Sequence, residues 1–217
     1  MKISVLNSTL AAVMFVFVCT SAHAAVISWN TWDTATSGTI NSTAVIFSAG
    51  GSTDNLVSGY PTYTPSSTFA DGSVVDNAPV SGNNIIQLTG GNANINTVTF
   101  STPVVNPVMA IWSLGDSGAS ASFDFIGVTP VFVSGGPSDQ YGGSSISISG
   151  DSVIGAEGNG TVQFHGTYSS ISWTNPVNEG WYGFNVGASP VPLPSAMLLF
   201  VSGLGGFLGI ARRKSGT

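Results

Sequence analysis

The body of this chain contains no lysine or arginine. The only basic side chains other than histidine are Lys2 at the start and Arg212, Arg213 and Lys214 close to the end, and the formal net charge is −6. All ten Asp and Glu residues lie between these two basic ends. A body of this charge repels phosphate, so we expect no nucleic-acid partner.

Cysteine and histidine are almost absent as well. The single cysteine, Cys19, lies in an apolar segment near the N-terminus, and His165 is the only histidine after His23. Zinc and iron sites need several nitrogen or sulfur ligands, so we expect no such metal centre. Once the N-terminal segment is removed, no disulfide is available, and the fold must be stabilised by its own core.

Residues that favour helices are also scarce in the body, which is rich in Gly, Ser, Thr, Asn and Val. Short apolar or alternating runs recur between turn-forming clusters, and a period of two indicates strands with one buried face. The sequence therefore predicts an all-β fold, an antiparallel β-sandwich of jelly-roll-like type, as one domain over residues 25–188. The predicted strands are Val26–Trp29, Ala44–Phe47, Ile85–Leu88, Ile95–Phe100, Val108–Leu114, Ala121–Phe125, Val128–Val133, Ser145–Ser149, Thr161–Phe164, Ser169–Trp173 and Trp181–Val186.

The N-terminal segment has the features of a signal peptide. An apolar run, Leu10–Cys19, follows Lys2 and is shorter than the roughly 20 residues that span a bilayer. The small residues Ala22 and Ala24 suit a signal peptidase. We predict a signal peptide over residues 1–24, cut between Ala24 and Ala25.

The C-terminal segment, residues 189–217, has three parts in order. Pro190, Pro192 and Pro194 disfavour a helix and keep the junction extended. The uncharged run 195–211 would span roughly 25 Å as a helix, the short end of a bilayer crossing. The basic triplet 212–214 stays in the cytoplasm and stops transfer. We therefore predict a single transmembrane helix and a precursor tethered to the inner membrane, with its acidic body outside the cytoplasm.

These three parts together resemble the PEP-CTERM family of protein-sorting signals, and more narrowly its Val-Pro-Leu-Pro-Ala variant. The matching residues are Val191, Pro192, Leu193, Pro194, Ser195 and Ala196, with Ser195 where the variant often has alanine. The resemblance implies cleavage near this box by an exosortase-type transpeptidase, followed by release or transfer to the cell surface. A plain C-terminal anchor that is never cut is the alternative.

The body also resembles the sandwich modules of PEP-CTERM proteins and, more loosely, the non-repetitive domains of streptococcal-type surface adhesins, over residues 100–115 and 155–184. The resemblance implies an exported surface or extracellular-matrix protein without enzymatic activity. A carbohydrate-binding or adhesin module is the alternative, because exopolysaccharide is associated with such sorting systems. For that alternative, Trp32, Trp181 and Tyr182 are the candidate glycan contacts, whereas Trp112 and Trp173 lie in apolar alternations and are expected in the core.

Enzymatic and calcium-dependent alternatives have weaker support. Residues 115–118 mimic the nucleophile loop of a trypsin-like protease, but no histidine precedes them in the body. Glu157 and Glu179 are the only glutamates, and as a pair they are the residue type that cleaves glycosides. We expect no cofactor; the spread carboxylates are predicted to be solvated, with a Ca²⁺ site as the open alternative.

Overall fold

The structure is a computed structural model that describes residues 24–51, 55–58 and 63–189. Ala22, the predicted sorting box 191–196, the apolar run and the basic triplet 212–214 lie outside the described residues. Within the described ranges, no helix is long and apolar enough to cross a membrane.

The described part of the chain is mostly β-structure. Its first strands are β1 (Ser28–Trp29), β2 (Thr31–Trp32), β3 (Ser37–Ile40), β4 (Thr43–Ser48) and β5 (Asn55–Val57). A short helix α1 (Ser66–Phe69) and a 3₁₀ turn η1 (Ser81–Asn83) come next. The remaining strands are β6 (Ile85–Val105), β7 (Val108–Leu114), β8 (Ala121–Phe125), β9 (Val131–Gly135), β10 (Ser144–Ser145), β11 (Ser147–Ser149), β12 (Ser152–Gly155), β13 (Gly158–Gln163) and β14 (Thr167–Ala188).

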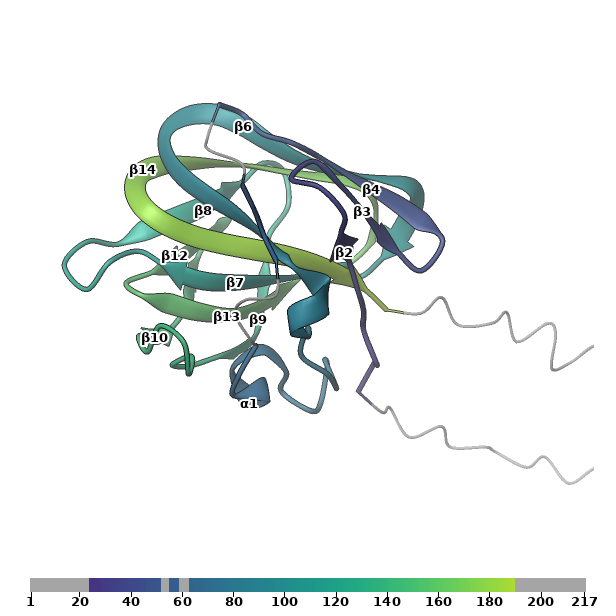
Figure 1. Cartoon of the computed structure of the whole chain (residues 1–217), viewed down its shortest axis with the longest axis horizontal. Helices are drawn as coiled ribbons and strands as arrows, with labels where there is room; N and C mark the ends of the chain where they lie inside the picture. The colour runs from purple at the N-terminus through teal and green to yellow at the C-terminus, as the bar shows by residue number, and fades with distance from the viewer. Residues whose placement is uncertain (1–23, 52–54, 59–62, 190–217) are drawn as a thin grey trace, which may run out of the picture.

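All of these strands belong to one sheet that curls over itself (Figure 1). The main path runs β10-β13-β7-β14-β6-β4-β3-β2, and every pair except the short β10–β13 contact is antiparallel. The prediction of an all-β, antiparallel fold is confirmed. Over residues 24–51, 55–58 and 63–189 the strands form one continuous sheet, because β6 and β14 are long enough to run through both halves of the curl.

The curl occurs where β6 and β14 bend together. Their pairing shifts register repeatedly between Trp173 and Tyr182, and on β6 the glycines Gly90 and Gly91 have φ of 60° and 86°. The sequence analysis predicted separate strands on either side of this region in both cases. That prediction was wrong because the local irregularity bends the strands without ending their pairing.

A buried asparagine stabilises this bend. The Oδ1 atom of Asn175 accepts hydrogen bonds from the indole N–H of Trp173, at 2.8 Å, and from the side-chain amide of Asn96, at 2.9 Å. Its own amide group donates to the carbonyl of Ser122 on β8, at 2.8 Å. Asn175 therefore ties three strands together at the point where the sheet turns.

The curled sheet encloses a core, here called the inner core. It is dominated by aromatic rings from both halves, with Phe47 and Trp173 stacked at 6.0 Å and Phe184 packed edge-on against both. An outer core lies on the other side of the half that contains β7. There Phe69 of α1 packs against Trp112 of β7. One half of the sheet is thus covered on both faces and the other on one face only.

The segment 33–82 contains β3, β4, β5 and α1, and of these only β4 overlaps a strand predicted from the sequence. α1 is four residues long, about one turn, so it is too short to show a helical period in the sequence. Its two buried residues, Thr68 and Phe69, cover the outer core.

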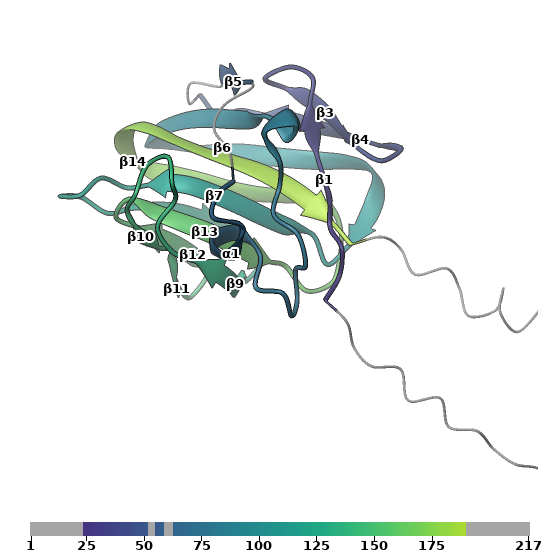
Figure 2. The same ribbon diagram turned by 60° about the horizontal axis from the view of Figure 1, so that its bottom comes forward.

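The two ends of the described fold lie side by side. Ser28 pairs with Ala188, and Trp29 with Gly187, where β1 joins the last residues of β14 (Figure 2). The backbone N–H of Ala25 donates to the carbonyl of Val74, so the fold includes Ala25. The chain therefore enters and leaves the fold at the same end of β14.

Candidate functional site

A cleft of about 340 Å³ lies at the other end of β7 from the chain ends. Its lining combines three acidic side chains with two aromatic ones: Asp116, Glu157, Glu179, Tyr141 and Trp181, together with Ser113 and Gly180. Val108, at the start of β7, pairs with Gly187, whereas Leu114 at its end borders the loop of Asp116. At about 3.3 Å per residue, the cleft is roughly 20 Å from the place where the chain enters and leaves the fold.

A β-bulge in β7 directs Ser113 toward the cleft. Ile111 and Leu114 both face the inner core although they are three residues apart, which a regular strand does not allow. The pairing with β13 shifts at this point, and Ser113 has φ of 48°. Ser113 is the extra residue, and an extra residue of this kind redirects the side chains beside it.

Glu157 is held in place through its backbone and its side chain. Its carboxylate accepts a hydrogen bond from the Ser113 hydroxyl at 2.8 Å. Its backbone N–H donates to the carbonyl of Gly115, and its carbonyl accepts from the N–H of Ser144. The left-handed backbone of Glu157, with φ of 55°, is stabilised by this network, which also includes the buried amide of Asn159.

Glu179 is the acidic residue of the cleft whose pKa is shifted by the fold. Partial burial raises the pKa of its carboxyl group from 4.5 to about 7. The backbone N–H of Gly115 donates to this carboxylate at 2.7 Å and opposes the rise, whereas the charges of Glu157 and Asp116 add to it. The fold therefore brings together the two glutamates named from the sequence, and Asp116 beside them.

Trp181 and Tyr141 form the aromatic wall of the cleft. Their ring centroids are 4.7 Å apart and the planes are tilted by 31°. Both residues are half-buried. Of the three candidate glycan contacts named from the sequence, Trp181 is the one that the structure places in a cleft.

The other two candidate contacts were wrong. Trp32 and Tyr182 are fully buried. Trp32 packs edge-on against Phe47 and Phe184 in the inner core. Tyr182 follows Trp181 on β14, and neighbouring side chains on a strand point to opposite faces, so the pair cannot share a surface. The prediction that Trp112 and Trp173 belong to the core is confirmed.

The loop that resembles a protease nucleophile loop forms one rim of the cleft. Asp116 and Ala119 exchange backbone hydrogen bonds across a tight turn, and Ser117 donates to its neighbour Asp116 at 3.1 Å. None of the described residues that line the cleft is a histidine, so Ser117 has no base there. His165 is exposed beyond the end of β13.

The described ranges contain no group of three or more His, Cys, Asp or Glu side chains arranged to hold a metal ion. The three cleft carboxylates are therefore close enough to influence one another's charge without forming a ligand set. The alternative of a Ca²⁺ site gains no support from this geometry.

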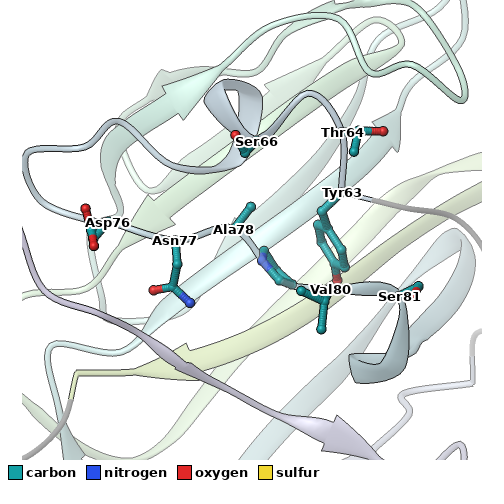
Figure 3. Close-up of a pocket in the computed structure, with 9 residues that line it drawn as sticks. Tyr63, Thr64, Ser66, Asp76, Asn77, Ala78, Val80 and Ser81 are labelled. Carbon is teal, nitrogen blue, oxygen red and sulfur yellow. The ribbon is translucent and has the colours of Figure 1, made fainter.

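A second hollow, of about 410 Å³, lies between residues 63–66 and 76–81 (Figure 3). In Figure 3 the Tyr63 ring extends toward the segment of Val80 and Ser81. The Asn77 side chain is already used: it accepts from the N–H of Ile27 and donates to the Ile27 carbonyl. The lining of this hollow is largely apolar, whereas the acidic cleft brings three carboxylates and two aromatic rings together, so the acidic cleft is the better candidate site.

No protein-family model, curated protein sequence or solved structure matches this chain. The chemistry of the cleft is therefore derived from its own residues. The carboxylates can accept hydrogen bonds from hydroxyl or ammonium groups, and the Trp181 ring can contact the face of a sugar. Tyr141 and Ser113 were not foreseen from the sequence: Tyr141 has no apolar alternation around it, and the bulge at Ser113 has no local sequence signal.

Proposed function

We propose that the chain is an exported surface or extracellular-matrix protein without enzymatic activity. An exosortase-type transpeptidase would cut it near residues 191–196 after the signal peptide has been removed. Its precursor would be tethered to the inner membrane with the body outside the cytoplasm. The body would then reach the cell surface or the medium. The order of Pro-rich box, apolar run and basic triplet carries the proposal.

The position of the chain ends supports this arrangement. A precursor with both of its ends in one membrane needs a body whose entry and exit points lie close together. Ser28 and Ala188 are paired neighbours on adjacent strands, so the fold meets that requirement without a long linker. The acidic cleft at the other end of β7 would then face away from the membrane.

Substitution of the box tests the sorting proposal. The double variant Pro192→Ala, Pro194→Ala should accumulate in the inner membrane of the native host, because the extended segment that the enzyme grips becomes able to form a helix. Immunoblotting of membrane, surface and medium fractions measures the shift. Pro190→Ala, just outside the box, is the control. Equal distribution of the two variants would mean that the box is not a processing signal.

A second candidate function is glycan binding at the acidic cleft, favoured by the aromatic wall of Trp181 and Tyr141. The Trp181 ring would stack on a sugar while Glu157 and Asp116 accept hydrogen bonds from its hydroxyls. Such a module could hold exopolysaccharide at the cell surface. For the fold we propose the description jelly-roll-like, because the two halves of the one curled sheet face each other across the inner core as the two layers of a β-sandwich do.

Glycan-array binding by the purified full chain tests this second function. Trp181→Ala should weaken binding at least about fivefold, because an aromatic contact contributes about 1 kcal/mol beyond its buried area. Phe132→Ala, which removes an aromatic ring that is 47% exposed on β9, is the matched control. No binding, or equal loss in both variants, would remove this candidate.

A further inference from the structure

Besides the acidic cleft, the fold has a second unusual surface. It is the outer face of the half of the sheet that is covered by the inner core on one face only. Its outward-facing side chains come from β3, β4, β8, β11, β12, the part of β6 over residues 95–101 and the part of β14 over residues 170–174. We call this surface the hydroxyl face. Successive side chains of a strand point to opposite faces. Phe47, Val98 and Trp173 point into the inner core, so the residues next to them on the same strands point outward.

Hydroxyl groups align across the strands of this face. Ser172 pairs with Thr97, and Thr97 pairs with Ser48. The Thr97 and Ser172 hydroxyls are hydrogen-bonded to each other at 2.9 Å. Side chains at such positions are spaced about 4.8 Å apart across strands and about 6.7 Å apart along them.

A second row runs parallel to the first. Ser170 pairs with Thr99, Thr99 with Ile46, and Ile46 with Ser37, and Ile46 is 48% exposed. On the other side of β14 the order is Thr174, Asp124, Ser152 and Ser149. The face is therefore a grid of hydroxyls with scattered exposed isoleucines, such as Ile46 and Ile95.

Charge is nearly absent from this grid. Asp124 is the single ionisable side chain among the outward-facing residues of these strands, and the body has no lysine or arginine to add. A charged partner would lose its hydration without finding a countercharge. A hydroxyl both donates and accepts hydrogen bonds, so it matches a partner whose groups do the same. Charge and hydrogen-bonding pattern both select an uncharged, hydroxyl-rich partner.

We propose that the hydroxyl face adsorbs an uncharged polysaccharide. Sugar hydroxyls would exchange hydrogen bonds with the Ser and Thr rows, and sugar C–H groups would contact Ile46 and its neighbours. The proposal deepens the matrix role and rests on the proposed export of the body. It is independent of the acidic cleft, which lies in the other half of the sheet.

Retention of the full chain, purified in mild detergent, on insoluble polysaccharides tests this directly. Cellulose, agarose and cross-linked dextran are the uncharged probes, and alginate gel is the anionic one. We expect retention on at least one uncharged probe and none on alginate. The double variant Thr97→Val, Thr99→Val keeps the shape and the strand preference but loses two hydroxyls. Its retention should fall about fivefold for each hydroxyl lost.

Three variants make the result specific. Thr97→Ser with Thr99→Ser keeps both hydroxyls and should be retained like the parent chain. Ser67→Glu, at an exposed position of α1 above the outer core, should also have no effect on retention. Phe132→Ala removes an exposed ring on β9, outside both the hydroxyl face and the cleft, and should leave retention unchanged. Failure to bind any uncharged probe, or equal retention of the valine and serine variants, would overturn the proposal. Because the assay uses purified protein, neither result depends on sorting.

Discussion

Glu179 carries its charge in an unfavourable place. Its carboxyl group is partly buried beside Glu157 and Asp116, and the body has no lysine or arginine to compensate it. Among the causes of its shifted pKa, the hydrogen bond from the N–H of Gly115 is the one that stabilises the charged carboxylate. The neutral form is therefore favoured by the fold more than the charged form.

The stability of the protein should reflect this pKa. A carboxyl whose folded pKa is about 7, against 4.5 unfolded, contributes stability below pH about 4.5 that is lost as pH rises to about 7. Glu179→Gln stays neutral, so its melting temperature should fall less than that of the parent chain over this range. Melting curves at half-unit pH steps measure the difference. Identical pH profiles for both proteins would show that Glu179 is solvated.

The two tryptophans on β14 should differ sharply when truncated. Trp173 is fully buried against Phe47 and donates to Asn175, so Trp173→Ala should cost about 3–5 kcal/mol of unfolding free energy. Trp181→Ala should cost clearly less, because the ring is half-exposed at the cleft. Urea unfolding of both variants gives the comparison. Equal losses would place Trp181 in the core.

At the residue scale, the sequence predicted the buried Trp112 and Trp173 because apolar alternation surrounds them. The sequence did not show which of Trp181 and Tyr182 is buried, because polar residues precede them and either side chain could point inward. In the structure they are consecutive residues of β14, so they lie on opposite faces of the sheet. Whether Glu157 and Glu179 would meet could not be predicted, because their proximity depends on which strands pair across the sheet.

At the scale of elements, the loop after β7 depends on one glycine. Gly115 has φ of 80°, and a Cβ there would collide with the carbonyl of Gly155. Gly115→Ala should therefore destabilise the fold by at least about 1 kcal/mol and disturb the N–H that Glu179 accepts. Gly118→Ala, in the same loop with open space around it, is the matched control. Equal unfolding midpoints would contradict this role.

The bend of β14 gives another element-scale prediction. Asn175→Ala leaves the buried Trp173 and Asn96 donors without their acceptor. The expected cost is about 2–3 kcal/mol or more, because unpaired buried polar groups keep their desolvation penalty. Denaturant titration measures it. A loss below 1 kcal/mol would mean that the bend is held by packing alone.

Strand positions were largely predictable, and strand continuity was not. The apolar runs that the sequence assigned to Ile85–Leu88 and Ile95–Phe100 both lie in β6, but the glycines and polar residues between them interrupt the alternation. Bends with Gly and Asn resemble turns in sequence because both need unusual backbone angles. Only the pairing with β14 shows that the strand continues.

At the scale of the whole molecule, charge and chain ends support the same account. The sequence places every lysine and arginine outside the described fold, and the structure brings the two ends of that fold side by side. One half of the sheet is covered on both faces, and the other presents the hydroxyl face. The charge distribution was visible in the sequence. The position of the chain ends and the uncovered face depend on the path of β6 and β14 through the curled sheet.

The intact mass of the protein recovered from the cell surface or the medium tests the account most directly. The account predicts a chain that begins at Ala25 and ends within residues 191–196. A mass that still includes residues 1–24 and 197–217 would contradict it.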